Sequence, residues 1–226
     1  MKKLVLLFGL VVLAAAAWGA DWAVDVAPNA GGKPEGTDST LELKWDTGTR
    51  GLGMAWYTGA GSWVGNDFDI STVSSYFGIS TIRMYTSSTW PNNSWEGMRY
   101  AVFAFTGGVP GSMLWPASGV GRFYRPDNGS GWVWVDVTVG WTLSTGVNVF
   151  CAASEQYYNY PTCDPFGLDN NPTFFNHSWQ RYGGSWAPMN GYESYPYKNL
   201  MLRVTVCDDA NRVSPSSMGR IKALYQ

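Results

Sequence analysis

Few residues of this sequence could support catalysis. A Ser–His–Asp or Cys–His arrangement would have to use His177, because it is the only histidine in the chain. The sequence around it, NHSW, has no nucleophile-elbow pattern, and the motif G-x-S-x-G does not occur. We therefore interpret His177 as a loop histidine and not as a catalytic base.

Paired carboxylates could hydrolyse a glycosidic bond if two of them converged on one cleft. The candidates are Asp136, Glu96, Glu155 and Glu193. No two of them have the i, i+2 spacing that would place both on one face of a strand. The sequence therefore favours a non-enzymatic protein and leaves a glycoside hydrolase as a weaker alternative.

One segment carries the oxygen ligands that calcium prefers. The stretch CDPFGLDNNP contains Asp164, Asp169, Asn170 and Asn171, but it lacks the EF-hand spacing. Asp and Asn are also used in turns for local backbone hydrogen bonds. Zinc is not expected, because the cysteine spacings match no ligand cluster. We expect no cofactor, with calcium at this loop as the alternative.

The stretch GWVWVDVTVGW (131–141) indicates another kind of chemistry, the stacking of aromatic rings on a ligand. Read with a period of two, it places valines on one face and Trp132, Trp134 and Asp136 on the other. Rigid rings beside a carboxylate could stack on sugar rings and bind their hydroxyl groups. Trp179 and Trp186 are added to this candidate surface. Further aromatic residues in loops could extend it: Trp90, Trp95, Tyr157, Tyr158 and Tyr160.

The same tryptophan face has two other interpretations. Long loops or the N-terminal segment could cover the rings. Alternatively, the rings could form a contact with a second copy of the chain or with another protein, because large exposed apolar patches mark contact sites. The sequence leaves the three interpretations open.

Short strands must position these residues. Alternating or continuous apolar runs predict strands at 40–45, 63–70, 79–87, 98–108, 131–141, 146–156 and 199–207. The Gly-rich stretch 46–63 is either a long loop or two short strands. Gly183 and Gly184 favour a two-residue hairpin in which Arg181 faces Trp186. Roughly eight to ten short strands without an amphipathic helix predict an all-β fold, an antiparallel β-sandwich of jelly-roll type.

The ends of the chain differ from this pattern. Lys2 and Lys3 precede an apolar run and small residues, which is typical of a secretory signal peptide. We expect a signal peptide at 1–19, although cleavage after Ala17 or Ala20 also fits. An N-terminal arm at 20–38, a β-sandwich domain at 39–208 and a C-terminal tail at 209–226 follow. The exported chain is expected to have no membrane span.

Export would place the three cysteines in an oxidising compartment, where two of them could pair. A Cys151–Cys163 disulfide is favoured because the loop between them is short, and closing it would stabilise the fold by about 3 kcal/mol. Three unpaired, buried thiols are the alternative.

Composition narrows the class of partner. Charged residues make up 14% of the chain and the formal net charge is −2, with no basic stripe, so nucleic acid is not an expected partner. The 13 tryptophans, 13 tyrosines and 27 glycines agree with pleated surfaces joined by turns.

Three stretches carry a resemblance: GWVWVDVTVGWTLSTGVNVFCAASEQ, HSWQRYGGSW and NLMLRVTV. They resemble a jelly-roll sandwich module of secreted bacterial multidomain proteins. STIRMYTS and VPGSMLW fit the same plan, so the resemblance spans residues 40–207. It implies an accessory module that has no catalytic signature.

The sequence thus predicts a secreted, non-enzymatic β-sandwich protein with a structural, adhesive or assembly role at the cell surface or outside the cell. A carbohydrate-binding module with an aromatic sheet-face platform is the alternative. The expected partners are polysaccharide or other surface proteins, with self-association included.

Overall fold

The computed structural model describes residues 40–71, 78–126, 129–144, 146–171, 173, 175–189 and 199–207, together with a strand at 22–26. The expected signal peptide (1–19) and C-terminal tail (209–226) lie outside these residues. The strand at 22–26 belongs to the expected N-terminal arm, the rest of which also lies outside. Among the described residues, no helix is long and apolar enough to span a membrane.

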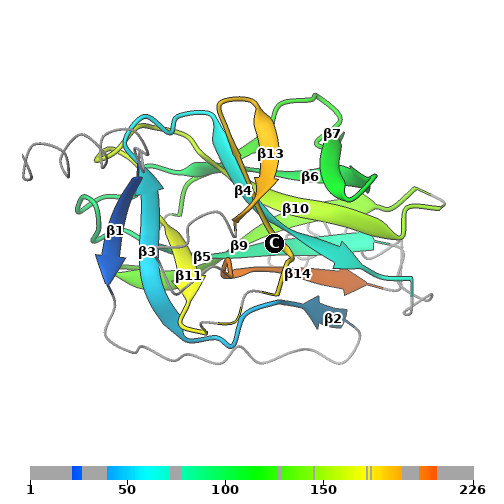
Figure 1. Cartoon of the computed structure of the whole chain (residues 1–226), viewed down its shortest axis with the longest axis horizontal. Helices are drawn as coiled ribbons and strands as arrows, with labels where there is room; N and C mark the ends of the chain where they lie inside the picture. Colours follow the sequence, from blue (N-terminus) through cyan, green and yellow to red (C-terminus); the bar gives the residue numbers. More distant parts are fainter. Residues whose placement is uncertain are drawn as a thin grey trace, which may run out of the picture.

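The described chain forms fourteen β-strands in three antiparallel sheets (Figure 1). The first sheet has the order β1 (Trp22–Val26), β3 (Arg50–Trp56), β11 (Phe166–Asp169). The second has the order β13 (Ser185–Pro188), β12 (Ser178–Tyr182), β4 (Ser62–Asp69), β10 (Val149–Gln156), β6 (Met98–Thr106), β7 (Val109–Trp115), and β8 (Arg122–Tyr124) also pairs with β6. The third has the order β2 (Thr40–Leu43), β14 (Leu202–Cys207), β5 (Gly78–Ser87), β9 (Trp132–Thr142).

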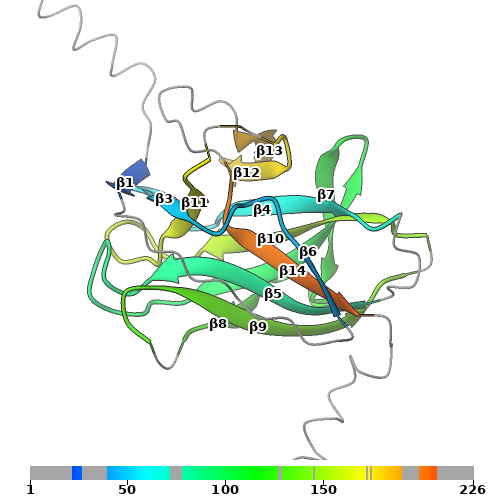
Figure 2. The ribbon, with the colours of Figure 1, turned by 90° about the horizontal axis from the view of Figure 1, so that it is seen from below.

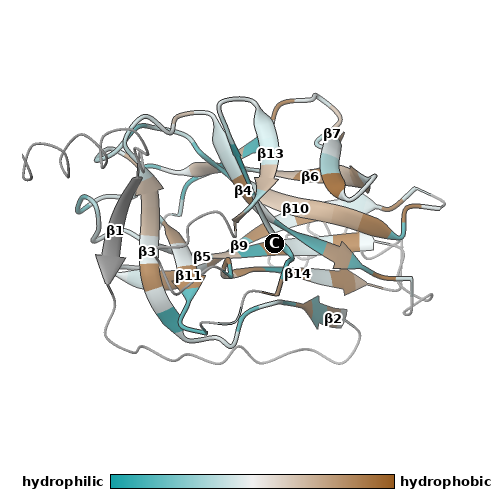
Figure 3. Ribbon diagram, in the orientation of Figure 1, coloured by the Kyte–Doolittle hydropathy of each residue, from teal (hydrophilic) through white to brown (hydrophobic). Residues whose placement is uncertain are grey.

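The second and third sheets lie face to face, as the view from below shows (Figure 2). Alternation along the strands turns one set of apolar side chains into the space between the sheets, while β4, β6 and β10 also carry a second apolar cluster that includes Trp63, Phe103 and Cys151. Val135 and Val137 of β9, for example, share the main core cluster with Phe68 of β4 and Phe150 of β10. The hydropathy colouring shows β3 and β10 as mostly apolar strands (Figure 3). The prediction of an all-β antiparallel fold is confirmed, and the arrangement is compatible with a β-sandwich; the jelly-roll connectivity stays a prediction.

A buried amide joins the two facing sheets. Asn66 of β4 is fully buried, and its Nδ2 donates to the carbonyl oxygens of Leu200 and Leu202 at 3.0 and 2.8 Å. Its Oδ1 accepts from the Ser178 hydroxyl at 2.8 Å. Every polar atom of this side chain has a partner, so its burial leaves no hydrogen-bonding group unsatisfied. The amide fixes β14 against β4 and the start of β12.

The hairpin predicted from the glycine pair is confirmed. Gly183 and Gly184 have φ angles of 71° and 113°, the left-handed region that favours glycine. β12 pairs with β13 so that Arg181 faces Trp186, and the guanidinium carbon lies 5.5 Å from the centroid of the Trp186 ring. The turn residues therefore determined the register of the hairpin.

Candidate binding surface

The outer face of β9 carries Trp132 and Trp134, the two tryptophans of the predicted aromatic platform. Trp132 and Trp134 are half-buried, because other side chains of the same chain lie against them. The Arg50 guanidinium lies 3.8 Å from the centroid of the Trp132 ring, and that of Arg203 lies 4.1 Å from the Trp134 ring. The ring of Tyr85 lies 5.7 Å from Trp132 and 5.1 Å from Trp134. Arginine stacking therefore occupies much of the proposed aromatic platform.

Asp136 belongs to the same face, and its carboxylate is used in an ion pair. Arg83 Nε and Nη2 donate to its two oxygens at 2.5 and 2.7 Å, which is a bidentate arrangement. The hydrogen bond to Asp136 raises the pKa of Arg83, and burial opposes this effect. Asp136 is thus a partner of an arginine and not an isolated acid.

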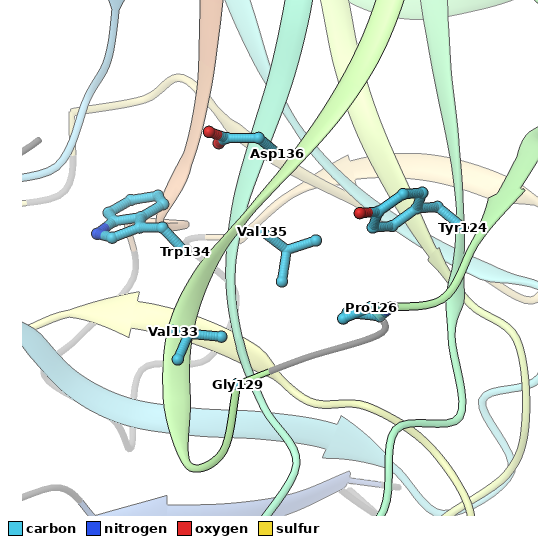
Figure 4. A pocket seen from close by; sticks show the side chains of 7 residues that line it. All are labelled: Tyr124, Pro126, Gly129, Val133, Trp134, Val135 and Asp136. Carbon is cyan, nitrogen blue, oxygen red and sulfur yellow. The ribbon is translucent and has the colours of Figure 1, made fainter. Parts of the chain in front are cut away.

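A hollow of about 350 Å³ lies at the unpaired edge of β9 (Figure 4). Trp134 and Asp136 lie on one side of it, and Tyr124 and Pro126 lie on the other. Val133, Val135 and Gly129 complete its lining. Tyr124 pairs with Met98 at the start of β6, and this end of the sandwich is rich in aromatic residues.

Several loops meet at that end, which we call the aromatic loop end. The register places Ser62 beside Gln156, and Gln156 beside Met98, so β4 and β6 begin where β10 ends. β8 pairs with the start of β6, and the β12–β13 turn follows Arg181, which pairs with Trp63. The aromatic members are Tyr57, Trp90, Phe123, Tyr124, Tyr157, Tyr158, Tyr160 and Tyr182.

Five of these rings are unusually exposed for large apolar side chains: Phe123 45%, Tyr124 36%, Tyr57 48%, Tyr158 41% and Tyr182 41%. The exposed rings contact less exposed ones. Tyr57 packs edge-on with Tyr160 at 4.7 Å between centroids. Tyr157 contacts both Tyr158 at 4.7 Å and Phe123 at 5.0 Å. Exposed aromatic groups of this size mark contact sites.

Buried hydrogen bonds hold the loops of this end in place. The side chain of Gln156, itself fully buried, accepts from Trp56 N at 2.8 Å and donates to Trp56 O at 2.8 Å and Tyr158 O at 2.9 Å. A Cβ at Gly59 would lie 2.6 Å from the Gln156 amide, so the 57–61 turn can approach this closely only with glycine. Ala60 N donates to Asn159 Oδ1 at 2.9 Å. The backbone on either side of Tyr57 and Tyr158 is therefore fixed.

A buried carboxylate supports the neighbouring loop. Asp164 is 2% exposed and accepts from the backbone N–H groups of Glu96 and Gly97 at 3.0 and 2.8 Å. Burial raises the pKa of Asp164 to about 6, although the two N–H groups act in the opposite direction. Asn92 Nδ2 ties the same loop to Pro161 O at 3.0 Å.

The carboxylates considered for glycosidic cleavage have separate structural partners. Arg99 Nη1 lies 3.6 Å from Glu155 Oε1. Burial raises the pKa of Glu155, and the charge of Arg99 acts in the opposite direction. Glu96 accepts from the hydroxyl of Ser94. Asp136 is paired with Arg83, and Glu193 lies outside the described residues.

His177, predicted as a loop histidine, makes specific contacts with Asp67 and Trp45. Its Nδ1 lies 2.8 Å from Asp67 Oδ2, and its ring stacks on Trp45 with 3.6 Å between centroids and 8° between planes. Asp67 also accepts from Trp179 Nε1 at 2.6 Å. In the described part of the chain, no serine or cysteine is hydrogen-bonded to the imidazole. The contacts are those of a packed, oriented side chain.

Trp179 and Trp186 lie on the second sheet, whereas Trp132 and Trp134 lie on the third. Trp179 is buried against Phe105, and Trp186 packs on Phe103 beside the small cluster of Trp63, Ala101, Cys151 and Ala153. The structure therefore does not join these two tryptophans with the β9 face into one surface.

The oxygen atoms of the candidate calcium loop already accept from the protein. Asp169 accepts from the Thr47 backbone N–H and hydroxyl, and Asn171 accepts from Thr173 N. Asp164 accepts from the backbone N–H groups of Glu96 and Gly97. Within the described ranges, no group of three or more His, Cys, Asp or Glu side chains is arranged to hold a metal.

The expected Cys151–Cys163 disulfide is not formed. Cys151, Cys163 and Cys207 are all buried thiols. Cys151 points into the small cluster on the second sheet, beside Ala101 and Ala153, whereas Cys163 lies in the loop next to Asp164. Burial raises the pKa of Cys151 and raises that of Cys163 to about 12, so neither thiol is activated.

No family model, curated protein or solved structure matches this chain. No family match therefore accompanies the resemblance to the bacterial jelly-roll module.

Sequence reasoning missed part of the aromatic loop end. Trp90, Tyr157, Tyr158 and Tyr160 were among the expected loop aromatics, but Tyr57, Phe123, Tyr124 and Tyr182 were not. One signal was available: WYTGAG and YYNYP both place tyrosines directly beside turn residues. Nothing in the sequence indicated that Gln156 joins these two segments.

Proposed function

We propose that the chain is a secreted, non-enzymatic β-sandwich that acts by contact at the cell surface or outside the cell, with the aromatic loop end as its contact surface. The single observation that supports this most strongly is that exposed rings stand on loops fixed by the buried side chain of Gln156. Such a surface loses little conformational freedom when it binds. Rigid tyrosines are typical of binding loops on β-sandwiches.

The partners of the acidic side chains support a role without bond cleavage. A glycosidase needs one carboxylic acid and one carboxylate on either side of a scissile bond. Here Asp136 is held by Arg83, Glu155 lies beside Arg99, and Asp164 caps a loop. The signal-like segment at 1–19 and the resemblance to an accessory module support export.

The proposal is tested by adhesion. Beads coated with the purified protein are incubated with bacterial cells and with isolated bacterial envelopes. The test variant carries both Tyr57→Ala and Tyr158→Ala. The control variant is Phe175→Ala, which removes an exposed ring (38%) outside the aromatic loop end. We expect the tyrosine variant to reduce adhesion at least about tenfold, a loss typical of binding hot spots, and the control to leave it unchanged. Equal adhesion of all three proteins would remove the aromatic loop end from the contact.

A further inference from the structure

We propose that the aromatic loop end, together with the hollow at the edge of β9, binds a neutral polysaccharide. The proposal rests on the proposed function and adds the chemical class of the ligand. It differs from the sequence-based alternative because the sugar would lie mainly on the loop end and would reach Trp134 and Asp136 only at the hollow, and not the arginine-covered ring of Trp132.

The first argument is the extent of the surface. Tyr124 lines the hollow with Trp134 and Asp136. Phe123 precedes Tyr124 in β8 and therefore points to the opposite face of that strand, where it contacts Tyr157 at 5.0 Å, and Tyr157 contacts Tyr158. Aromatic rings thus lie both at the hollow and at the 157–160 loop, and an extended polymer is long enough to contact both groups, whereas a single small molecule is not.

The second argument is the way in which the rings are presented. Tyr57 and Tyr158 are 48% and 41% exposed, and each packs edge-on with a second tyrosine ring. The apolar C–H faces of sugar rings stack on such aromatic rings, and the phenol oxygens can donate to or accept from sugar hydroxyls. Asn159, exposed beside them, adds an amide whose oxygen is used by Ala60 N and whose nitrogen is a donor.

The third argument is electrostatic and concerns the sign of the ligand. Several charged side chains described along the surface are already engaged: Asp136 pairs with Arg83, and Glu155 pairs with Arg99, whose guanidinium also lies 4.4 Å from the Tyr157 ring centroid. Arg122 donates to the carbonyl oxygen of Thr138 at 3.0 Å. An ionic polymer or a charged protein patch would compete with these interactions, whereas a neutral, hydroxyl-rich chain would not.

Affinity electrophoresis tests the ligand class. The purified protein is run in native gels cast with neutral polysaccharides (a mixed-linkage glucan, xyloglucan, galactomannan, mannan) and, separately, with acidic ones (alginate, polygalacturonate). We expect retardation by at least one neutral polymer. Tyr57→Ala with Tyr158→Ala should weaken it at least about tenfold, while Tyr57→Phe with Tyr158→Phe, which keeps the rings, should retain most of it. Phe175→Ala is the control for a ring elsewhere, and the thermal unfolding midpoint of each variant verifies its fold.

The outcomes separate this inference from the proposed function. Absence of retardation in every neutral gel, retardation by acidic polymers only, or retardation that the tyrosine variant leaves unchanged would overturn the neutral-glycan assignment. If, at the same time, adhesion to cells still depended on Tyr57 and Tyr158, the contact function would stand and its partner would be a protein or a charged polymer. If adhesion also failed to depend on them, both proposals would fall.

Discussion

The side-chain amide of Gln156 pairs with both backbone groups of Trp56, accepting from its N–H and donating to its carbonyl oxygen, each at 2.8 Å. The two residues are one hundred positions apart, and the amide joins the last residue of β10 to the last residue of β3. A third bond to Tyr158 O fixes the loop that carries exposed tyrosines.

Replacing this amide should loosen the aromatic loop end. Gln156→Ala leaves Trp56 N and Tyr158 O without this partner, whereas Trp56 O keeps the N–H of Tyr160 at 3.2 Å. A buried unsatisfied group costs about 1–3 kcal/mol, and the variant also removes a fully buried side chain. We expect a loss of about 3 kcal/mol in the free energy of unfolding, measured by urea denaturation. Asn148→Ala, at an exposed amide, is the control and should change it by less than about 0.5 kcal/mol. A loss as small as that of the control would mean that Gln156 does not hold the loops.

The two arginines that face the outer side of the third sheet should differ strongly in their contribution to stability. Arg203 is 1% exposed and pairs with Asp46, whose side chain is fully buried, so Arg203→Met leaves a buried charge alone. We expect a loss of about 3–5 kcal/mol in unfolding free energy.

Arg83→Met provides the matched comparison on the same face. Its partner Asp136 has a side chain that is 49% exposed, so we expect a loss of about 1 kcal/mol or less. Denaturation of both variants under one set of conditions gives the difference. Equal losses would contradict the distinction between a buried and an exposed ion pair.

Asp164 should give the stability a specific pH dependence. Its pKa in the folded chain is about 6, above the ordinary value of 3.8, so the folded state holds a proton that the unfolded state releases between these values. The stabilisation from this proton is complete below about pH 4 and is lost as the pH rises through 6.

The test compares the protein with Asp164→Asn, which cannot titrate. Between pH 4 and 6, the unfolding free energy of the protein should fall by up to about 3 kcal/mol relative to that of the variant. A constant difference between the two proteins across this range would show that the pKa of Asp164 is not raised.

The three cysteines should behave as buried thiols. Iodoacetamide should label none of them rapidly in the folded protein and all three after unfolding, whether or not a reductant is present. Mass spectrometry of the alkylated protein counts the labels. One label on the unfolded protein without reductant and three with it, a gain of two on reduction, would indicate a disulfide.

Features that depend on neighbouring residues could be predicted from the sequence. The alternation in 131–141 placed Val135 and Val137 in the core, and Gly183–Gly184 determined the register of Arg181 with Trp186. Features that depend on distant pairings were not accessible. Arg50 covers Trp132 although more than eighty residues separate them, and no local pattern indicates that contact. The same reason explains why Gln156 and the exposed Tyr57 were missed.

Hydroxyl-radical footprinting of the protein with and without isolated bacterial envelopes tests the central claim most directly, because it locates the contact residue by residue. We predict that binding protects Tyr57, Phe123 and Tyr158 from oxidation and leaves Phe175 unprotected. Protection of Phe175 with unchanged oxidation of the three loop-end rings would contradict the claim that this protein acts through its aromatic loop end.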